Sequence, residues 1–243
     1  MNQFDEISFK VIARIKSDFH DKFGIPRQSG LLKSLRSTVV FEPEFRNADA
    51  LRGLEGFSHL WLLWIFSENV RDSWKPTVRP PRLGGNSRLG VFATRSSFRP
   101  NPLAMSCVKI ESINLMGEVG EGAPSITVSG ADLMEGTPIV DIKPYLPYAD
   151  SVPEATGGFA ETVRFKKLDV EFAEGVLVAD INSAGVFPEN KKAALIELLS
   201  EDPRPAYQKD ADRIYGIRFA GFEIKFRVQG DRLTVVSISP IQV

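Results

Sequence analysis

Apolar residues in the first 150 positions fall into short runs, several of which alternate with polar residues at the period of a β-strand. The runs that we interpret as strands cover residues 7–13, 37–42, 57–66, 89–94, 103–115, 125–130 and 138–142. Connections rich in glycine and proline join them. Strands at this spacing favour a closed sheet, because closure leaves no unpaired edge. We therefore predict a mostly β fold whose N-terminal domain, residues 1–150, is a single-sheeted β-barrel.

The pattern changes after Asp150, and residues 151–158 (SVPEATGG) have the composition of a flexible linker. Beyond the linker, residues 168–185 fit either a helix or a strand followed by a turn. A helix and then three strands of an antiparallel meander are predicted over residues 191–199, 214–219, 222–228 and 233–238. We therefore expect a small α+β C-terminal domain over residues 159–243.

Composition is that of an ordinary globular protein, with 243 residues of which 43% are apolar. No run approaches the roughly 18 apolar residues of a membrane-spanning helix, and the first residues lack a basic segment leading into an apolar one. We therefore expect a cytoplasmic protein with no membrane partner. Cys107, His20 and His59 form no cluster at metal-ligand spacing, so we expect no metal. We interpret His59 and Cys107 as core residues, and Trp61 and Trp64 as packing residues rather than base-stacking ones.

The formal net charge is −1, which at first argues against a nucleic-acid partner, but the cations are unevenly distributed. Between residues 71 and 99 the only acidic residue is Asp72. The basic residues of the same stretch are Arg71, Lys75, Arg79, Arg82, Arg88, Arg95 and Arg99. This local excess of positive charge predicts an anionic ligand.

Two segments have the residue types of a binding site. Residues 79–102 (RPPRLGGNSRLGVFATRSSFRPNP) hold five arginines, four prolines and three glycines, although turns with solvated arginines would give the same composition. No helix follows Gly84-Gly85, so this is neither a Walker loop nor a dinucleotide-binding loop. Residues 130–150 place carboxylates beside a lysine and two tyrosines. These side chains form a polar pocket or, alternatively, cap turns.

Five stretches of the chain resemble the TrmO (YaeB) family in their order and spacing. They are FGIPRQSGL at 23–31, LRGLEGFSHLWLLWIF at 51–66, the 79–102 segment, DLMEGTPIVDIKPYLPYAD at 132–150 and EDPRPAY at 201–207. The resemblance covers nearly the whole chain, and its two middle motifs are long and specific. Two positions depart from the family: Ala104 replaces a usual glycine, and Ser67 replaces a common histidine and so removes a bulky donor near the expected cofactor pocket.

The resemblance implies a homodimeric enzyme that methylates N6 of threonylcarbamoyladenosine next to the anticodon, at position 37 of tRNA, with S-adenosylmethionine as the methyl donor. It also implies a single-sheeted β-barrel followed by a smaller domain. The residues that it assigns to the cofactor site are Pro26, Arg27, Gln28, Ser67, Glu68, Arg95, Leu103, Asp132, Leu133, Met134 and Glu135. Arg95 has the clearest chemical reason, because a guanidinium group pairs well with the methionine carboxylate.

Methyl transfer from a sulfonium depends mainly on positioning, because the leaving group departs neutral. In the threonylcarbamoyl form, N6 belongs to a urea whose remaining proton is more acidic, so a neighbouring carboxylate can act as a general base. Asp141 is our candidate for the base, and Tyr145 would stack on the nucleobase. Lys143 would meet the threonyl carboxylate or a phosphate. The arginines expected to bind RNA are Arg79, Arg82, Arg88, Arg99 and Arg204.

Two other functions are compatible with the same residues. The first is a methyltransferase of this fold with another RNA or small-molecule acceptor, which would share every cofactor residue. The second is a non-catalytic RNA-binding module. Cofactor binding separates the second from an enzyme, because a binding module has no need of an arginine for the methionine carboxylate.

Overall fold

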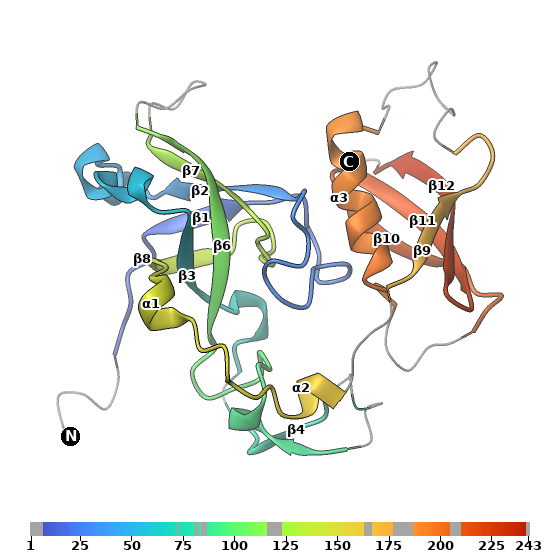
Figure 1. Ribbon diagram of the computed structural model, residues 1–243, viewed down its shortest axis with the longest axis horizontal. Coiled ribbons are helices and arrows are strands. Elements are labelled where there is room, and N and C mark those ends of the chain that lie inside the picture. Colours follow the sequence, from blue (N-terminus) through green and yellow to red (C-terminus); the bar gives the residue numbers. More distant parts are fainter. Residues whose placement is uncertain are drawn as a thin grey trace.

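The computed structural model describes residues 7–71, 73–80, 83, 87–115, 123–162, 167–176, 187–204 and 210–241. Its strands form a closed six-stranded barrel, a four-stranded sheet and a two-stranded ribbon (Figure 1). The predicted fold class, a mostly β protein with a single-sheeted barrel and a small α+β part, is confirmed. The domain boundaries that we place at residues 150 and 158 stay a prediction.

The barrel closes in the order β1-β2-β7-β6-β3-β8, and each pair of neighbours is antiparallel. Its strands are β1 (Ala13–Lys16), β2 (Arg36–Phe41), β3 (His59–Ile65), β6 (Leu103–Asn114), β7 (Ser125–Ser129) and β8 (Pro138–Pro144). In β3 the side chains of Leu60, Leu62 and Trp64 are buried inside the barrel, and the residues between them are half-exposed outside it. Each such buried side chain stabilises the fold by roughly 1.5–3 kcal/mol.

This alternation corrects part of the predicted core. Trp64 is buried, as predicted. His59, Trp61 and Cys107 are only half-buried, because they occupy the outward positions of β3 and β6. The interpretation of His59 and Cys107 as core residues is therefore wrong: an apolar run on one strand does not tell which of its residues face inward.

Two predicted strands are also shorter than expected. Residues 7–12 lie outside any strand, and Ile7 and Phe9 are 68% and 61% exposed. Within residues 89–94, only β5 (Leu89–Gly90) is a strand, and it pairs with β4 (Thr77–Val78) outside the barrel. The alternation in these segments is real, but a strand also needs a partner in register, which local sequence does not reveal.

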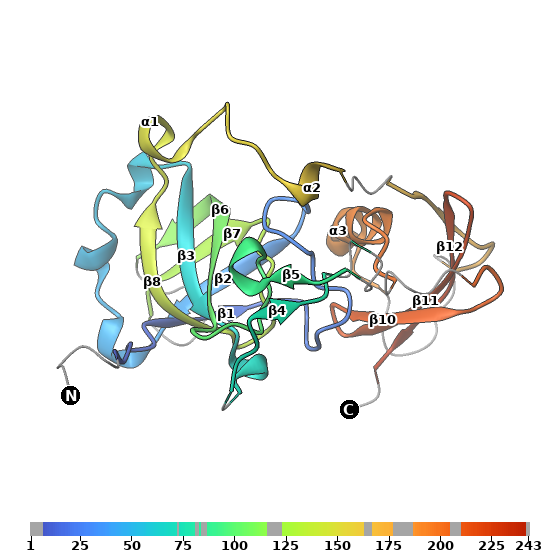
Figure 2. The ribbon, with the colours of Figure 1, turned by 90° about the horizontal axis from the view of Figure 1, so that it is seen from below.

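The connections carry short helical segments. These are η1 (Pro43–Phe45), η2 (Ala48–Leu51), η3 (Leu54–Gly56), η4 (Ser67–Asn69), η6 (Val91–Ala93), α1 (Pro147–Asp150) and α2 (Phe159–Thr162). Figure 1 shows α2, in the connection that leaves the barrel, close to β4, and Figure 2 shows the same helix between the barrel and α3. In the part of the chain that the structure describes, no helix is both long enough and apolar enough to cross a membrane.

The C-terminal part packs one helix on one sheet. The sheet has the order β10-β11-β12-β9, with an antiparallel meander and a parallel fourth strand. Its elements are β9 (Asp169–Phe172), α3 (Glu189–Ser200), β10 (Tyr215–Phe219), β11 (Phe222–Gln229) and β12 (Arg232–Pro240). The start of the segment left open between helix and strand is therefore a strand, whereas residues 177–185 lie outside the described residues.

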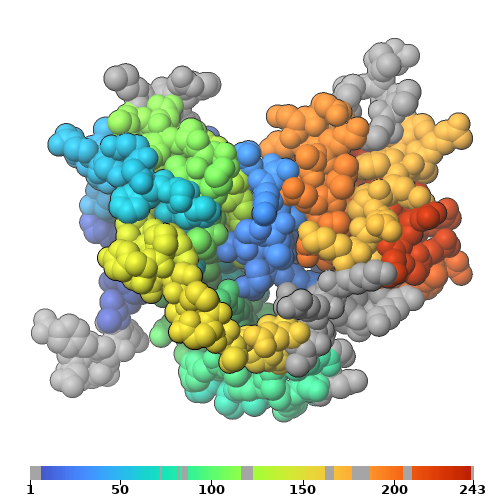
Figure 3. All heavy atoms as spheres, viewed as in Figure 1, coloured from blue at the N-terminus to red at the C-terminus, as the bar shows by residue number. Residues whose placement is uncertain are grey.

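A second hydrophobic core lies between α3 and this sheet, and it includes residues from the barrel's own sequence. Phe19, Leu32 and Leu35, from the connection between β1 and β2, are each at most 1% exposed and belong to this core. The Phe19 and Phe219 ring centroids are 5.5 Å apart. In Figure 3 this connection, in blue, fills the space between the green barrel and the orange α3. The β1–β2 connection is therefore shared between the barrel and the C-terminal sheet.

Candidate active site

A cavity of about 520 Å³ lies at the barrel edge where β3 ends and β6 begins. Ile65 pairs with Leu103 at this edge, which brings the segments after β3 and before β6 together. The β1–β2 connection and the β7–β8 connection complete the wall. Four segments that are distant in sequence thus meet in one place.

Most of the residues assigned to the cofactor by the family resemblance line this cavity. They are Pro26, Arg27, Gln28, Ser67, Glu68, Arg95, Leu103, Asp132 and Met134. Two others do not line it. The Leu133 side chain is fully buried in the barrel core, and the Glu135 carboxylate accepts a hydrogen bond of 2.5 Å from the backbone N–H of Ser17. Leu133 therefore anchors the β7–β8 connection in the barrel core, and Glu135 bonds the same connection to the residue after β1.

Arg95 presents its guanidinium group to two neighbours at the cavity. Its Nη1 donates a hydrogen bond of 2.5 Å to the Gln28 side-chain carbonyl, and the Gln28 amide nitrogen in turn donates to the backbone carbonyl of Arg27 at 2.5 Å. The Arg95 charge also acts on the Asp132 carboxyl group. The guanidinium group is therefore oriented, yet it keeps further N–H groups for an anionic ligand.

Asp132 ends a chain of hydrogen bonds that begins inside the barrel. The Trp64 indole N–H donates to Ser106 Oγ at 2.9 Å, and the Ser106 hydroxyl donates to Asp132 Oδ1 at 2.5 Å. Burial raises the pKa of Asp132, and the Ser106 hydrogen bond and the Arg95 charge oppose that rise. A carboxyl group in this position gains from a cationic or hydrogen-bond-donating ligand, because such a ligand stabilises its charged form.

Two glycines let the cavity walls approach each other. The backbone N–H of Gly30 donates to the Gly130 carbonyl at 2.8 Å, and Gly130 has a φ of +79°. A Cβ atom on Gly130 would lie 3.1 Å from both the N and the Cα of Gly30. Glycine is therefore required at residue 130 both by the backbone conformation and by the contact. Gln28 lies two residues before Gly30, and Asp132 lies two residues after Gly130. The contact between the glycines therefore constrains the spacing between Gln28 and Asp132.

A larger cleft of about 1550 Å³ adjoins the cavity and carries the cationic stretch. Of the predicted RNA-binding arginines, Arg79, Arg88 and Arg99 line the cleft, whereas Arg82 lies outside the described residues. Thr94, Arg95 and Arg99 line both the cleft and the cavity. The two spaces therefore adjoin each other along these residues.

The remaining two cations assigned to RNA lie elsewhere. Lys143 Nζ is 2.9 Å from Asp141 Oδ2 on β8. Arg204 is largely buried and pairs with Asp202 through two hydrogen bonds of 2.8 Å, which raise the pKa of Arg204. Neither residue lines the cleft. The structure therefore does not bring them together with the other predicted RNA-binding residues.

The predicted catalytic residues do not line the cavity, and only Asp141 lies near it; the Tyr145 backbone N–H donates to His59 at the opposite end of β3. Asp141 pairs with Leu63 across β8 and β3, and Leu63 lines the cavity. Directly opposed residues of an antiparallel pair face the same side of the sheet, so Asp141 lies beside the cavity wall. Tyr145 packs against Trp61, with ring centroids 5.8 Å apart, and against His59.

The residues that support Asp132 have no role in the sequence-based prediction of the site. Ser106 is buried at an inward position of β6, in a run that otherwise places apolar residues there. A polar residue at an inward strand position is the signal that could have revealed it. Among the described residues, no group of three or more His, Cys, Asp or Glu side chains could hold a metal ion.

Comparison with known proteins finds relatives over both parts of the chain. Residues 14–151 match the family model of the tRNA-methyltransferase O N-terminal domain, and residues 166–241 match that of the TrmO C-terminal domain. The tRNA (adenine(37)-N6)-methyltransferase of Escherichia coli K12 is 39% identical over 234 residues, which cover 96% of this chain and 97% of that protein. The putative S-adenosylmethionine-dependent methyltransferase RcsF of Pseudomonas aeruginosa is 42% identical over 219 residues, or 89% of this chain and 90% of that one. A crystal structure of TrmO from P. aeruginosa matches with a TM-score of 0.74 at 31% identity, covering 99% of this chain and 100% of the other.

Proposed function

This chain belongs to the tRNA-methyltransferase O (TrmO) family, and from that membership we propose that it methylates N6 of adenosine 37 in tRNA with S-adenosylmethionine. The threonylcarbamoyl form of that adenosine is the acceptor that the chemistry favours, because its urea N–H is the more acidic. With tRNA as the substrate, we expect the enzyme to act in the cytoplasm.

The shared wall of the cavity and the cleft carries this proposal. A pocket of about 520 Å³ has the size of a small-molecule site, and the adjoining cleft presents a row of arginines of the kind that binds a polyanion. Thr94, Arg95 and Arg99 belong to both. A methyl donor in the cavity and an RNA strand in the cleft would therefore meet at these residues.

The side chains of the cavity fit S-adenosylmethionine, which supplies an electrophilic methyl group on a sulfonium centre. The Arg95 guanidinium group is placed to bind a carboxylate. The Asp132 carboxyl group can accept hydrogen bonds from an ammonium group or from ribose hydroxyls. Leu103 and Met134 give apolar surface on which an adenine ring can lie. In this arrangement the protein holds and orients its substrates, which is the main requirement of the reaction.

Asp141 remains our candidate for the general base, with Lys143 and Tyr145 as neighbours of the acceptor. Its position beside the Leu63 wall supports the assignment, because a base must reach N6 from outside the cofactor cavity. We expect Asp141→Asn to lower kcat by about 100-fold or more while leaving the Kd for S-adenosylmethionine unchanged. The matched control is Asp49→Asn, an exposed carboxylate on η2. Turnover of Asp141→Asn near that of the control would remove Asp141 from the mechanism.

We also propose that the enzyme is a homodimer, as the family resemblance implies. Met105 is 55% exposed on the outward side of β6, next to Leu63 on β3, and apolar side chains on a barrel surface are suited to covering by a second copy. Light scattering at micromolar concentration should give the mass of two chains. A single-chain mass would contradict the proposal.

The proposed function is tested by incubating the purified chain with radiolabelled S-adenosylmethionine and bulk tRNA. We expect label in the RNA fraction, and strongly reduced label with Arg95→Ala, which removes the carboxylate partner. Cofactor binding without label in tRNA would point to another acceptor. Failure to bind the cofactor would instead point to a binding module.

A further inference from the structure

The cleft beside the cavity has an unusual charge composition for a protein with a net charge of −1. Its described lining includes no aspartate or glutamate. Its cationic lining residues are Arg27, Arg71, Lys75, Arg79, Arg88, Arg95 and Arg99. Such a surface attracts the phosphates of a nucleic acid, but charge alone does not distinguish a duplex from an unpaired strand.

Exposed aromatic rings lie among these cations. Trp74 is 50% exposed, Phe92 is 73% exposed and Phe98 is 40% exposed, and all three line the cleft. The Trp74 and Phe92 ring centroids are 6.1 Å apart with the planes inclined by 35°, and Arg71 Cζ lies 4.1 Å from the Phe98 ring centroid. Large aromatic side chains left in contact with water at a concave surface usually mark a binding site.

The local fold keeps the Phe92 ring exposed. Phe92 is the middle residue of η6, whose first residue, Val91, is buried with 1% exposure. The Val91 N–H donates to the Pro76 carbonyl at 2.9 Å, and the Thr94 N–H closes the turn on the Val91 carbonyl at 3.1 Å. Pro76 follows Trp74 closely in the chain, so this backbone contact holds the segments that carry the two rings side by side.

We propose that Trp74 and Phe92 form a stacking site for unpaired bases of the tRNA anticodon loop, while the surrounding arginines bind its phosphates. A ring can stack only on a base face that is free, and the base faces of a duplex are already covered by their neighbours. The combination of cations with exposed rings is therefore suited to a single-stranded loop. This inference rests on the proposed function and adds the part of the substrate that the cleft recognises.

The position of the rings agrees with such a role. The cleft joins the cofactor cavity through Thr94, Arg95 and Arg99, so loop nucleotides held on Trp74 and Phe92 would lie next to the nucleotide that receives the methyl group. On another side the cleft is lined by Phe159 and Ala160 of α2, which Figure 1 shows close to β4. The cleft is thus lined by the connection between β3 and β6 and by the connection that follows β8.

The test measures binding of a fluorescently labelled anticodon stem-loop RNA, in the presence of S-adenosylhomocysteine, to the full chain. We expect Trp74→Ala and Phe92→Ala each to weaken stem-loop binding by about tenfold or more, and Trp74→Phe to retain most of the affinity. Binding of a blunt RNA duplex of equal phosphate number should change by less than about twofold, because it depends on the arginines. The matched control is Tyr148→Ala, an aromatic residue that is 87% exposed and lies outside the cleft lining.

Several results would overturn the inference. The first is that Trp74→Ala and Phe92→Ala bind the stem-loop as tightly as Tyr148→Ala does. The second is that each alanine variant loses as much affinity for the duplex as for the stem-loop. A change of oligomeric state with unchanged RNA affinity would show that the rings belong to a protein interface. Failure of the proposed function is recognised separately, because it would appear as absent methyl transfer by the unaltered enzyme, whatever the stem-loop affinity of the variants. An unchanged Kd for S-adenosylmethionine verifies that each variant is folded.

Discussion

At the scale of single residues, the cofactor cavity depends on a polar chain built into an apolar wall. Trp64 and Ser106 are buried, and their hydrogen bonds lead to Asp132, a carboxyl group whose pKa is raised by burial. The Asp132 carboxyl group is therefore costly to charge in the empty protein, and a bound ammonium or hydroxyl group offsets that cost. The burial of Asp132 therefore favours the binding of a ligand that carries an ammonium or hydroxyl group.

The pH dependence of stability follows from the direction of this shift. A carboxyl group whose pKa is raised by folding stabilises the folded state fully below its unfolded pKa, and the contribution is lost as pH rises through the folded pKa. Asp132→Asn has no such titration. We expect the melting temperature of the variant, minus that of the wild type, to increase as pH rises from about 4 to about 8 in cofactor-free protein.

The same variant should bind S-adenosylmethionine at least about tenfold more weakly, because a charge-assisted hydrogen bond is replaced by a neutral one. Thermal melts across the pH range and calorimetric titration of the cofactor measure the two effects. A melting difference that is constant with pH would contradict the stated role of Asp132.

At the scale of elements, the shape of the cavity depends on two connections whose backbones are in contact at a pair of glycines. The β1–β2 connection carries Gln28 and the β7–β8 connection carries Asp132, and the Gly30–Gly130 backbone contact joins them. Neither connection belongs to a strand, so their relative position depends on this contact and on the surfaces beneath them. A small displacement here would separate the groups that orient the ligand.

Gly130→Ala tests this contact. An alanine at residue 130 must adopt a positive φ and also push against the Gly30 backbone, so we expect a loss of roughly 1–3 kcal/mol of stability and a weaker affinity for S-adenosylmethionine. Gly53→Ala is the matched control, because Gly53 also has a positive φ but no atom lies within 4 Å of its added Cβ. Denaturant melts and calorimetry compare the two. Equal effects on cofactor affinity would exclude the contact as the cause.

Most barrel strands could be predicted because each is a short apolar run bounded by turn residues, although the run of β3 does not tell which of its side chains face inward. The packing of Phe19, Leu32 and Leu35 on the C-terminal sheet could not be predicted, because these residues follow no period and their partners lie far along the chain. The cofactor residues came from family motifs rather than from spacing. Arg95 and Asp132 are brought together by strand pairing that no local pattern contains, and their roles stay predictions.

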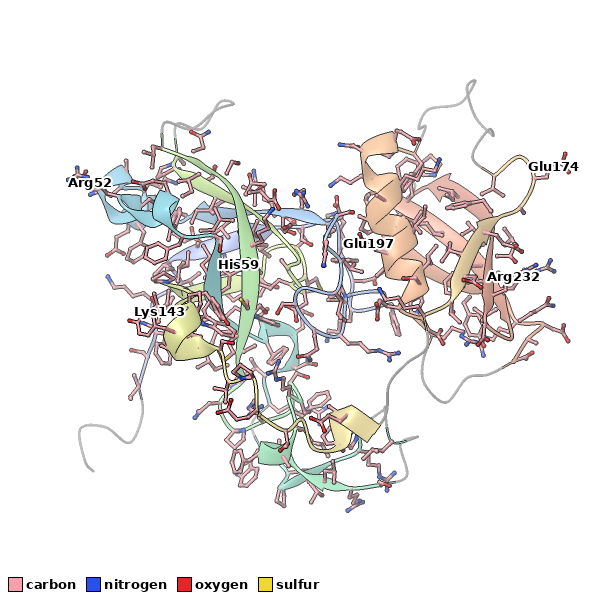
Figure 4. All side chains as sticks on the ribbon, in the orientation of Figure 1. Arg52, His59, Lys143, Glu174, Glu197 and Arg232 are labelled. Atoms are coloured by element: carbon pink, nitrogen blue, oxygen red, sulfur yellow. The ribbon has the colours of Figure 1, made fainter. Side chains whose placement is uncertain are left out.

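At the scale of the whole molecule, α3 contacts the connection that lines the candidate cofactor cavity of the barrel. The Glu197 carboxylate on α3 accepts hydrogen bonds from Ser34 N–H and Oγ at 2.9 and 2.8 Å, and Lys191 pairs with Asp18 at 2.5 Å. Figure 4 labels Glu197 on the side of α3 that faces the β1–β2 connection. Arg27 also donates to the backbone carbonyl of Asp202 at 3.2 Å. The connection that carries Gln28 is thus held on one side by the barrel and on the other by α3.

Glu197→Ala removes the acceptor of Ser34 without touching the cavity. We expect KM for S-adenosylmethionine to rise between about twofold and thirtyfold, with kcat at saturating cofactor nearly unchanged, since the variant loosens a binding loop and leaves the reacting groups in place. Glu189→Ala, at the exposed start of the same helix, is the matched control. If Glu197→Ala matched the control in KM, the C-terminal sheet would have no part in positioning the loop.

The central claim, that this chain methylates N6 of adenosine 37 in tRNA, is tested most directly by nucleoside mass spectrometry. Bulk tRNA that carries the threonylcarbamoyl modification, and tRNA that lacks it, are each incubated with the purified chain and S-adenosylmethionine and then digested to nucleosides. We expect methylated threonylcarbamoyladenosine from the modified tRNA only. Methyl transfer to a different nucleoside, or equal transfer to both tRNAs, would contradict it.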